Sequence, residues 1–181
     1  LLARRQATCE AGCHTALVWI SVPPCPRRWR GRRLDGWDAW RTLAEPLAAL
    51  PVGKGELLRE GDDLLLCAVG AMVAPAQALA ETLAAEGRAC AVINARFIKP
   101  LDAPLIQAWA RRCRGLVTLE EGCAPGGFSG AVAESLADAG ILRPLLRCAV
   151  PDHLVHHGDP KRLLEDEGLS PEKLLERIRD F

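Results

Sequence analysis

The chain has 181 residues, enough for one domain of ordinary size that needs no disulfide bonds to bury a core. Its 23 basic and 23 acidic residues balance, which argues against nucleic acid as the main partner. No stretch approaches the ~18 consecutive apolar residues of a membrane-spanning helix. We therefore expect neither a nucleic-acid nor a membrane partner.

Charge is distributed unevenly along the chain. Residues 1–44 carry eight Arg and three acidic residues, whereas residues 45–181 carry fifteen basic and twenty acidic residues. The first segment also holds four of the five Trp and has no periodic apolar pattern. We predict an irregular or disordered segment over 1–44 and a folded domain over 45–181.

Residues 1–44 have two functional interpretations. One is a basic arm at 23–33 for nucleic acid or a membrane, and the other is a zinc site at Cys9, Cys13, His14 and Cys25. We favour a disordered or aberrant extension over both. Our hypothesis for its mixture of Arg, Trp, Cys and Pro is an out-of-frame reading of GC-rich DNA.

The remaining cysteines are scattered and mostly lie inside apolar runs. This pattern is typical of reduced, buried thiols in a cytoplasmic protein and not of a disulfide framework. The residues concerned are Cys67, Cys90, Cys113, Cys123 and Cys148.

From residue 45 the chain alternates short apolar runs with helical patterns. The predicted strands span 52–58, 64–69, 89–93, 116–119 and 145–150. The predicted helices span 71–86, 102–113 and 128–139, and two short ones begin at Asp159-Pro160 and Ser170-Pro171. This order predicts an α/β fold of about five strands, mostly parallel, with helices on both faces. The first strand is expected to be antiparallel because only a short turn joins it to the second.

The rest of the domain is arranged around residues 116–130. An apolar strand ends at an acidic pair, Glu120 and Glu121, and a glycine turn leads into a helix. Such βα junctions face the functional crevice of open α/β sheets. The pair is either a general acid/base pair or a structural device. In the structural reading, which we favour, one carboxylate accepts backbone amides at the helix start and the other faces a neighbouring domain.

The turn itself has two readings. Gly126 and Gly127 either cradle a phosphate or permit tight packing, and we favour packing. Farther along, His153, His156 and His157 could ligate a metal. No Cys or carboxylate stands beside them at ligand spacing, so we expect no metal site.

Four stretches together resemble one family. They read Val-Gly-Lys-Gly-Glu at 52–56, Asn-Ala-Arg-Phe-Ile-Lys-Pro-Leu-Asp at 94–102, Val-Thr-Leu-Glu-Glu-Gly at 117–122 with Gly-Gly-Phe at 126–128, and Pro-Asp-His-Leu-Val-His-His-Gly at 151–158. In this order they resemble loops in the C-terminal domain of transketolase-like enzymes, most of all the 1-deoxy-D-xylulose-5-phosphate synthase family. The resemblance covers about 45–181. His156 departs from it, since the family usually has an acidic residue there.

The resemblance implies a transketolase C-terminal-domain-like fold. Synthases of this family are transferases that condense pyruvate with glyceraldehyde 3-phosphate, with loss of CO2, on thiamine diphosphate and Mg²⁺. The product feeds isoprenoid and thiamine synthesis. Neither Gly61-Asp62-Asp63 nor Gly158-Asp159-Pro160 matches their diphosphate–Mg²⁺ motif. We therefore expect no catalytic, cofactor-binding or metal residue here, and no activity of this fragment alone.

The expected role is packing against the upstream catalytic domains and against a second subunit of a homodimer. The alternatives are the C-terminal domain of a 2-oxoacid dehydrogenase β subunit or of a transketolase, or a non-catalytic association module. The expected interdomain rim comprises Arg96, Lys99, Glu120, Glu121, Gly126, Gly127, Asp152 and His157. Arg96 and Lys99 either hold an anionic substrate or are solvated loop charges, and the second is favoured. Because the loops follow parallel strands, they are expected to meet at one edge of the sheet.

Overall fold

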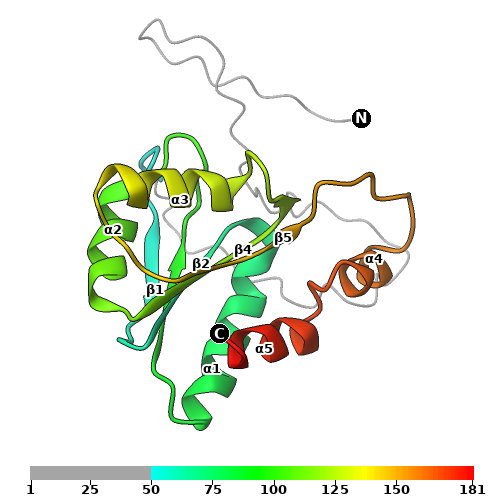
Figure 1. The fold of residues 1–181 in the computed structure, drawn as a ribbon, viewed down its shortest axis with the longest axis horizontal. Coiled ribbons are helices and arrows are strands. Elements are labelled where there is room, and N and C mark those ends of the chain that lie inside the picture. The colour runs from blue at the N-terminus through cyan, green and yellow to red at the C-terminus, as the bar shows by residue number, and fades with distance from the viewer. Residues whose placement is uncertain (1–49) are drawn as a thin grey trace, which may run out of the picture.

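The computed structural model describes residues 50–181. The predictions for residues 1–44, and the first five residues of the predicted domain, lie outside the described residues. The described part is a twisted sheet with helices packed on both faces (Figure 1). In chain order, its elements are β1 (Glu56–Arg59), β2 (Leu64–Ala68), η1 (Gly70–Met72), α1 (Val73–Ala85), β3 (Cys90–Asn94), α2 (Ala103–Arg112), β4 (Gly115–Cys123), α3 (Phe128–Asp138), β5 (Leu145–Val150), α4 (Pro160–Asp166) and α5 (Pro171–Arg179).

The sheet has five strands in the order β1-β3-β2-β4-β5. Strand β1 is antiparallel to β3, and the other three pairings are parallel. The predicted fold, mostly parallel with an antiparallel edge strand, is confirmed. The first strand is antiparallel as expected, but it pairs with β3 and not with β2, to which the short turn joins it. Parallel partners occupy both edges of β2 over its full length, so β1 can pair only with the outer edge of β3.

The buried strands divide their side chains between two cores. Leu64, Leu66 and Ala68 face α1 and α5, where they join Leu79, Leu83, Leu174 and Ile178. Leu65 and Cys67 face α2 and α3, where they join Ile106, Trp109, Phe128 and Val132. This split follows from the period of two along a strand, and it explains why these strands are apolar throughout.

Strand β4 is longer than predicted. The apolar run at 116–119 marks its buried part, but the strand continues through Glu120 to Cys123, which pairs with Val150 after a register shift. The predicted turn at 122–127 is therefore shortened to 124–127. Polar and glycine residues at 120–122 concealed the extension, because backbone pairing with β5 holds them in the sheet whatever their propensity.

Three predicted helix caps are present. The Asp102 carboxylate accepts the Leu105 amide at 3.4 Å, and Asp159 accepts the amides of Lys161 and Arg162, each at 3.1 Å. Ser170 accepts the Lys173 amide at 3.5 Å. Each cap is followed within two residues by a proline in the first helical turn. Proline has no backbone N–H, but the N–H groups of the first turn have no partner within the helix, so no hydrogen bond is lost.

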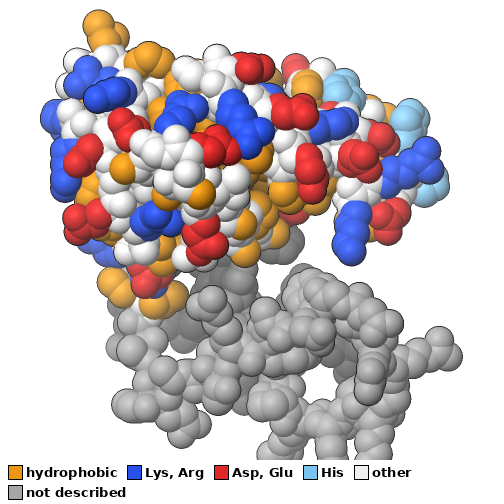
Figure 2. Space-filling model, turned by 90° about the horizontal axis from the view of Figure 1, so that it is seen from below, with side chains coloured by type: hydrophobic (Ala, Val, Ile, Leu, Met, Phe, Trp, Pro, Cys, Tyr) orange, Lys and Arg blue, Asp and Glu red, His pale blue; other side chains and the backbone are white. Residues whose placement is uncertain are grey.

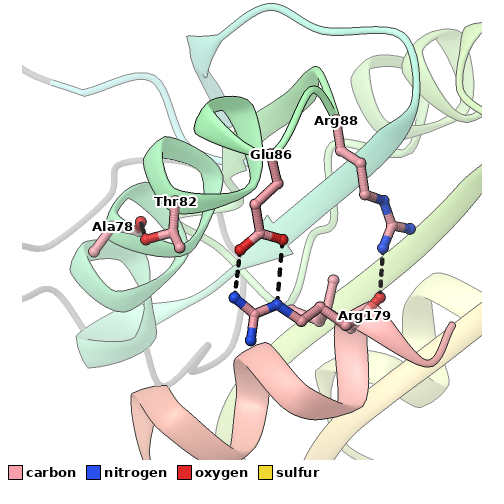
Figure 3. Close-up of polar contacts among 6 residues, drawn as sticks. Ala78, Thr82, Glu86, Arg88 and Arg179 are labelled. Carbon is pink, nitrogen blue, oxygen red and sulfur yellow. Dashed lines mark hydrogen bonds and ion pairs between the residues drawn. The ribbon is translucent and has the colours of Figure 1, made fainter.

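The last helix is bound to the end of α1 by two arginines (Figure 3). Arg179 forms a two-point ion pair with Glu86, with one of its nitrogens 3.2 Å from the carboxylate. Arg88 Nη1 donates to the Ile178 carbonyl at 2.9 Å. The hydrogen bond from Arg179 and the charges of Arg179 and Arg88 lower the pKa of Glu86. Helix α5 is therefore a fixed part of the domain.

We predict that Glu86→Gln destabilises the full chain at pH 7 and that this destabilisation is smaller at pH 3. The pKa of Glu86 is lowered by folding, so its stabilisation is complete above the unfolded pKa of about 4.3 and is lost as the pH falls through the folded pKa. Urea unfolding of the unsubstituted chain and of the variant at both pH values measures the difference in their free energies of unfolding. Glu81→Gln on the same helix is the matched control, since Glu81 has no ion pair within residues 50–181.

Candidate functional site

The winding of the chain reverses between β2 and β4. The connection through α1 leads from β2 to β3, and the connection through α2 leads back to β4 on the other face of the sheet. Ligands of doubly wound sheets bind in the crevice at such a switch point, beyond the carboxyl ends of the strands. Here that position lies between residues 69–72 and the end of β4, where the Val69 amide donates to the Leu119 carbonyl at 3.2 Å.

The side chain of Glu120 occupies the position at the N-terminus of α3 where a bound anion would be expected. Its side chain is 2% exposed, and its carboxylate oxygens accept the amides of Phe128 and Ser129, both at 2.8 Å. These N–H groups lack partners within the first turn of α3, and the helix dipole favours a negative charge beside them. The prediction that one carboxylate of the pair binds amides at this helix start is confirmed, one and two residues after Gly127.

The turn glycines serve two different purposes. A Cβ at Gly127 would lie 2.1 Å from the Cys123 carbonyl oxygen and 2.6 Å from Glu120 Oε2, and one at Gly122 would lie 2.8 Å from the same Oε2. Gly126 has open space around it but takes a φ of 71°, which L residues disfavour. Tight packing accounts for Gly127 and the left-handed backbone accounts for Gly126. A phosphate cradle is not needed to explain either, because the amides that follow them already donate to Glu120.

Arg147 fixes the same turn from strand β5. Its Nε donates to Ser129 Oγ at 3.1 Å, and a second guanidinium nitrogen donates to the Ala124 carbonyl. The Ala124 amide donates to the Val150 carbonyl at 2.8 Å. Sequence reasoning missed Arg147, whose one signal is a lone charge within an apolar strand run.

Glu120 and Glu121 do not form an acid/base pair. Successive strand residues point to opposite faces, and accordingly Glu120 is buried against α3 while Glu121 is exposed. Glu120 is held by two amide donors in a buried site, which leaves it without access to a substrate. The structural reading of the pair, with Glu121 facing outward, is the one that the geometry supports.

The loop at 94–101 binds the incoming chain. Arg96 has a left-handed backbone with a φ of 57°, and its guanidinium pairs with Glu56 of β1. Asp102 is 6% exposed and accepts the Gly55 amide at 3.1 Å. Lys99 is exposed. These contacts favour a structural role for Arg96, and they leave Lys99 as a solvated charge.

The third predicted loop leads from β5 toward α4 (Figure 1). Its Asp152 and His157 are exposed, and His153 Nε2 lies 2.9 Å from Glu167 Oε1. Figure 2 shows the histidines at one end of the molecule, with both signs of charge interspersed around them. Within residues 50–181 no group of three or more His, Cys, Asp and Glu is arranged to hold a metal ion.

Among the hydrogen bonds and ion pairs of the described residues, two of the three loops contact each other, and the meeting of all three stays a prediction. The turn after β4 contacts the loop after β5, where Cys123 Sγ lies 3.8 Å from the Pro151 carbonyl oxygen. The contacts of 94–102 run to 54–56 instead. The reason is strand order: β2 separates β3 from β4, which at about 4.8 Å per strand is a gap of roughly 10 Å.

The buried cysteines are unsuited to nucleophilic chemistry. Burial raises the pKa of the thiols of Cys67, Cys90 and Cys148, and burial with the nearby Asp62 charge raises that of Cys113 to about 11. Such thiols stay protonated near neutral pH.

The described residues do not fit thiamine diphosphate with Mg²⁺. The first-turn amides of α3 are bound by Glu120, and no carboxylate cluster for the metal stands nearby in this part of the chain. Two surface hollows, of about 450 and 370 Å³, lie instead at the amino ends of the strands, one beside Leu145 and the other beside Leu64 and Gly115. None of the helices within residues 50–181 has both the length and the apolar character needed to cross a membrane.

Comparison with known proteins agrees with this geometry. Residues 53–174 match the family model described as the transketolase C-terminal domain. The chain is 52% identical over 141 residues to 1-deoxy-D-xylulose-5-phosphate synthase of Synechococcus sp. (strain CC9605), an alignment that covers 78% of the chain and 21% of that enzyme. It is 48% identical over 170 residues to the synthase of Gloeothece citriformis (strain PCC 7424), covering 91% of the chain and 25% of the relative.

A solved structure is similar as well. The split-gene transketolase described as an inactive β4 tetramer has a TM-score of 0.70 and 32% identity, with 77% of this chain and 46% of that chain covered. The chain thus spans only about a fifth of the length of the curated relatives it matches, at their C-terminal part. The alignment with the Gloeothece citriformis synthase covers 91% of the chain, so it includes part of residues 1–44. Similarity within this segment argues against an out-of-frame reading of all of it.

We predict that Glu120→Gln destabilises the chain by about 1–3 kcal/mol, the usual cost of an unsatisfied buried partner. A Gln side chain presents an NH2 group to one of the two amides and so leaves that amide without an acceptor. Glu121→Gln, at the exposed neighbour, should be neutral within measurement error. Chemical denaturation of both variants measures the difference, and equal midpoints would contradict the buried cap.

Substitutions at the two adjacent glycines should destabilise the chain to different degrees. Gly127→Ala forces its methyl against the Cys123 carbonyl and Glu120, and it should cost about 1–3 kcal/mol as an overpacked site. Gly126→Asn should cost under about 1 kcal/mol, since Asn tolerates left-handed backbone and the site is open. Thermal melts of both variants test this. A costlier change at Gly126 would show that backbone conformation, and not space, limits the turn.

Proposed function

The chain belongs to the transketolase C-terminal domain family, and from this premise we propose that it is the C-terminal domain of a 1-deoxy-D-xylulose-5-phosphate synthase. The complete enzyme would be a cytoplasmic transferase that converts pyruvate and glyceraldehyde 3-phosphate to 1-deoxyxylulose 5-phosphate and CO2. The observation that carries the proposal is identity of about half the residues over nearly four fifths of the chain. The 32% identity to the split-gene transketolase is lower, which favours the synthase over a transketolase.

The domain's part in that enzyme is assembly. Thiamine diphosphate and Mg²⁺ would be bound by upstream domains, as the lack of a fitting site in residues 50–181 supports. Here the polar side chains at the carboxyl edge of the sheet hold the neighbouring backbone segments in place. The Glu120 carboxylate holds the start of α3, and Arg147 ties the preceding turn to β5.

The rim predicted from sequence becomes two contact surfaces in this proposal. One is the turn at 121–127 with the loop at 151–158, which presents the exposed Glu121, Asp152 and His157. The other is the loop at 96–100 beside the incoming chain, which presents Lys99. Both would face the other domains and the second subunit of a homodimer. Turns held by hydrogen bonds such as those of Ala124 suit this role, because little ordering entropy is lost on contact.

A domain exchange tests the proposal. The C-terminal domain of the Synechococcus sp. (strain CC9605) synthase is replaced by residues 50–181 of this chain, and turnover is measured with pyruvate and glyceraldehyde 3-phosphate. We expect dimers with turnover within about tenfold of the parent, a loss of no more than roughly 1.4 kcal/mol in the barrier. The 181-residue chain alone should show no turnover.

Two controls bound the result. The parent enzyme truncated before this domain should fail to assemble, which shows that the domain is needed. The same exchange into a transketolase should work less well, because identity there is lower. An assembled synthase chimera without turnover, or a better transketolase chimera, would contradict the assignment.

A further inference from the structure

Strand β5 forms one edge of the sheet (Figure 1). Within residues 50–181 it pairs with β4 on one side and has no strand on the other. An edge of this kind presents a row of backbone N–H and C=O groups, to which another chain can add a strand. Folded proteins therefore usually block such an edge with charged side chains, with proline or with a covering element.

Two hydrogen bonds to β4 and its turn fix which groups of β5 face outward. The Pro144 carbonyl accepts the Leu116 amide at 2.9 Å, and the Val150 carbonyl accepts the Ala124 amide at 2.8 Å. The N–H and C=O groups of one strand residue point to the same side, and the side alternates along the strand. Even-numbered residues therefore face β4. The residues whose backbone groups face outward are Leu145, Arg147 and Ala149.

Arg177 of α5 covers the middle of this outward edge. Its Nη2 donates to the Arg147 carbonyl at 2.9 Å, as the alternation along the strand allows. Burial raises the pKa of the Cys148 thiol, and the positive charge of Arg177 opposes that rise, which places the charge beside the same part of the strand. Leu174 and Ile178 on the same helix are fully buried against the sheet, so the helix holds the guanidinium in this position.

A second copy of the chain is the partner that this edge fits. The outward groups lie at 145, 147 and 149, which are placed symmetrically about residue 147. Two such strands related by a two-fold axis through Arg147 would run antiparallel, and the two central residues would exchange both of their hydrogen bonds. Residue 145 of each copy would meet residue 149 of the other. The edge is therefore complementary to itself.

We propose that Arg177 is an edge guard, which keeps two copies of the chain from pairing through β5 by binding the Arg147 carbonyl. The contact engages the acceptor that the central pair needs, and it places a cation where the second copy would bring an identical cation. The Arg147 side chains would also lie opposite each other in that pairing, and like charges directly opposite are destabilising. The homodimer of the proposed function would form through other surfaces, so the two proposals are tested separately.

Substitution of Arg177 and of a matched cation in the 181-residue chain tests the guard. Arg177→Met keeps an apolar stem but removes the charge and the donors. Lys173→Met is the control, because Lys173 lies on the same helix and its Nζ donates to the Glu165 carbonyl at 2.6 Å. Each change thus removes one charge and one hydrogen bond to a backbone carbonyl. In sedimentation equilibrium we expect Arg177→Met to self-associate at least about tenfold more tightly than the unsubstituted chain, and Lys173→Met to match that chain.

Hydrogen exchange of single amides locates the pairing surface. In the unsubstituted chain, the outward amides of Arg147 and Ala149 should exchange faster than the inward amides of Leu146 and Cys148, which the ladder with β4 protects. In the associated Arg177→Met variant, the two outward amides should become at least about tenfold slower, because a second strand then covers them.

The proposal is overturned if Arg177→Met associates no more tightly than the unsubstituted chain, or if Lys173→Met associates as tightly as it does. It is also overturned if the outward amides of the associated variant still exchange fast, because the association then uses another surface. Equal protection of outward and inward amides in the unsubstituted chain would show that the edge is already covered and would overturn the proposal as well. This last comparison decides the matter even where Arg177→Met fails to fold.

Discussion

The β4–α3 junction depends on one buried charge. The carboxylate of Glu120 is removed from water, which is costly unless the charge is fully bonded. Two amides of α3 and the positive end of the helix dipole meet that requirement, and they meet it only because Gly122 and Gly127 leave room for the carboxylate. The position of α3, the length of β4 and the shape of the turn between them are therefore fixed together.

A second carboxylate organises the part of the domain near β1 and β3 in the same way. Asp102 caps α2 through the Leu105 amide and also accepts the Gly55 amide of the incoming chain. Like Glu120, it is buried and is satisfied mainly by backbone donors, which sets helix position and loop path at once. These two acidic residues thus act as structural centres on the two sides of β2, and the exposed loops around them inherit their rigidity.

Sequence patterns predicted the elements better than the contacts between them. Apolar runs marked the strands, and Asp102, Asp159 and Ser170 marked helix starts, because both signals are local. The partner of β1 and the extension of β4 depend on which edges other strands leave free, which no local pattern encodes. The spacing of the rim loops likewise depends on the strand order, which places β2 between β3 and β4. The sequence did not indicate a role for Arg147, because its hydrogen bonds go to Ser129 and Ala124, which are distant in sequence.

The start of α3, beside the switch point, is closed by side chains of the domain itself. In a doubly wound sheet the crevice at that point is open when free helix amides and a flexible glycine turn await a ligand. Here the amides of Phe128 and Ser129 are bound by a side chain of the domain itself, and Arg147 holds the turn from β5. What remains at this edge is a rigid outer surface with exposed charges such as Glu121. In the proposed function, a surface of that kind recognises a neighbouring domain by its shape and its charge, because the groups that hold its backbone are already paired within the domain.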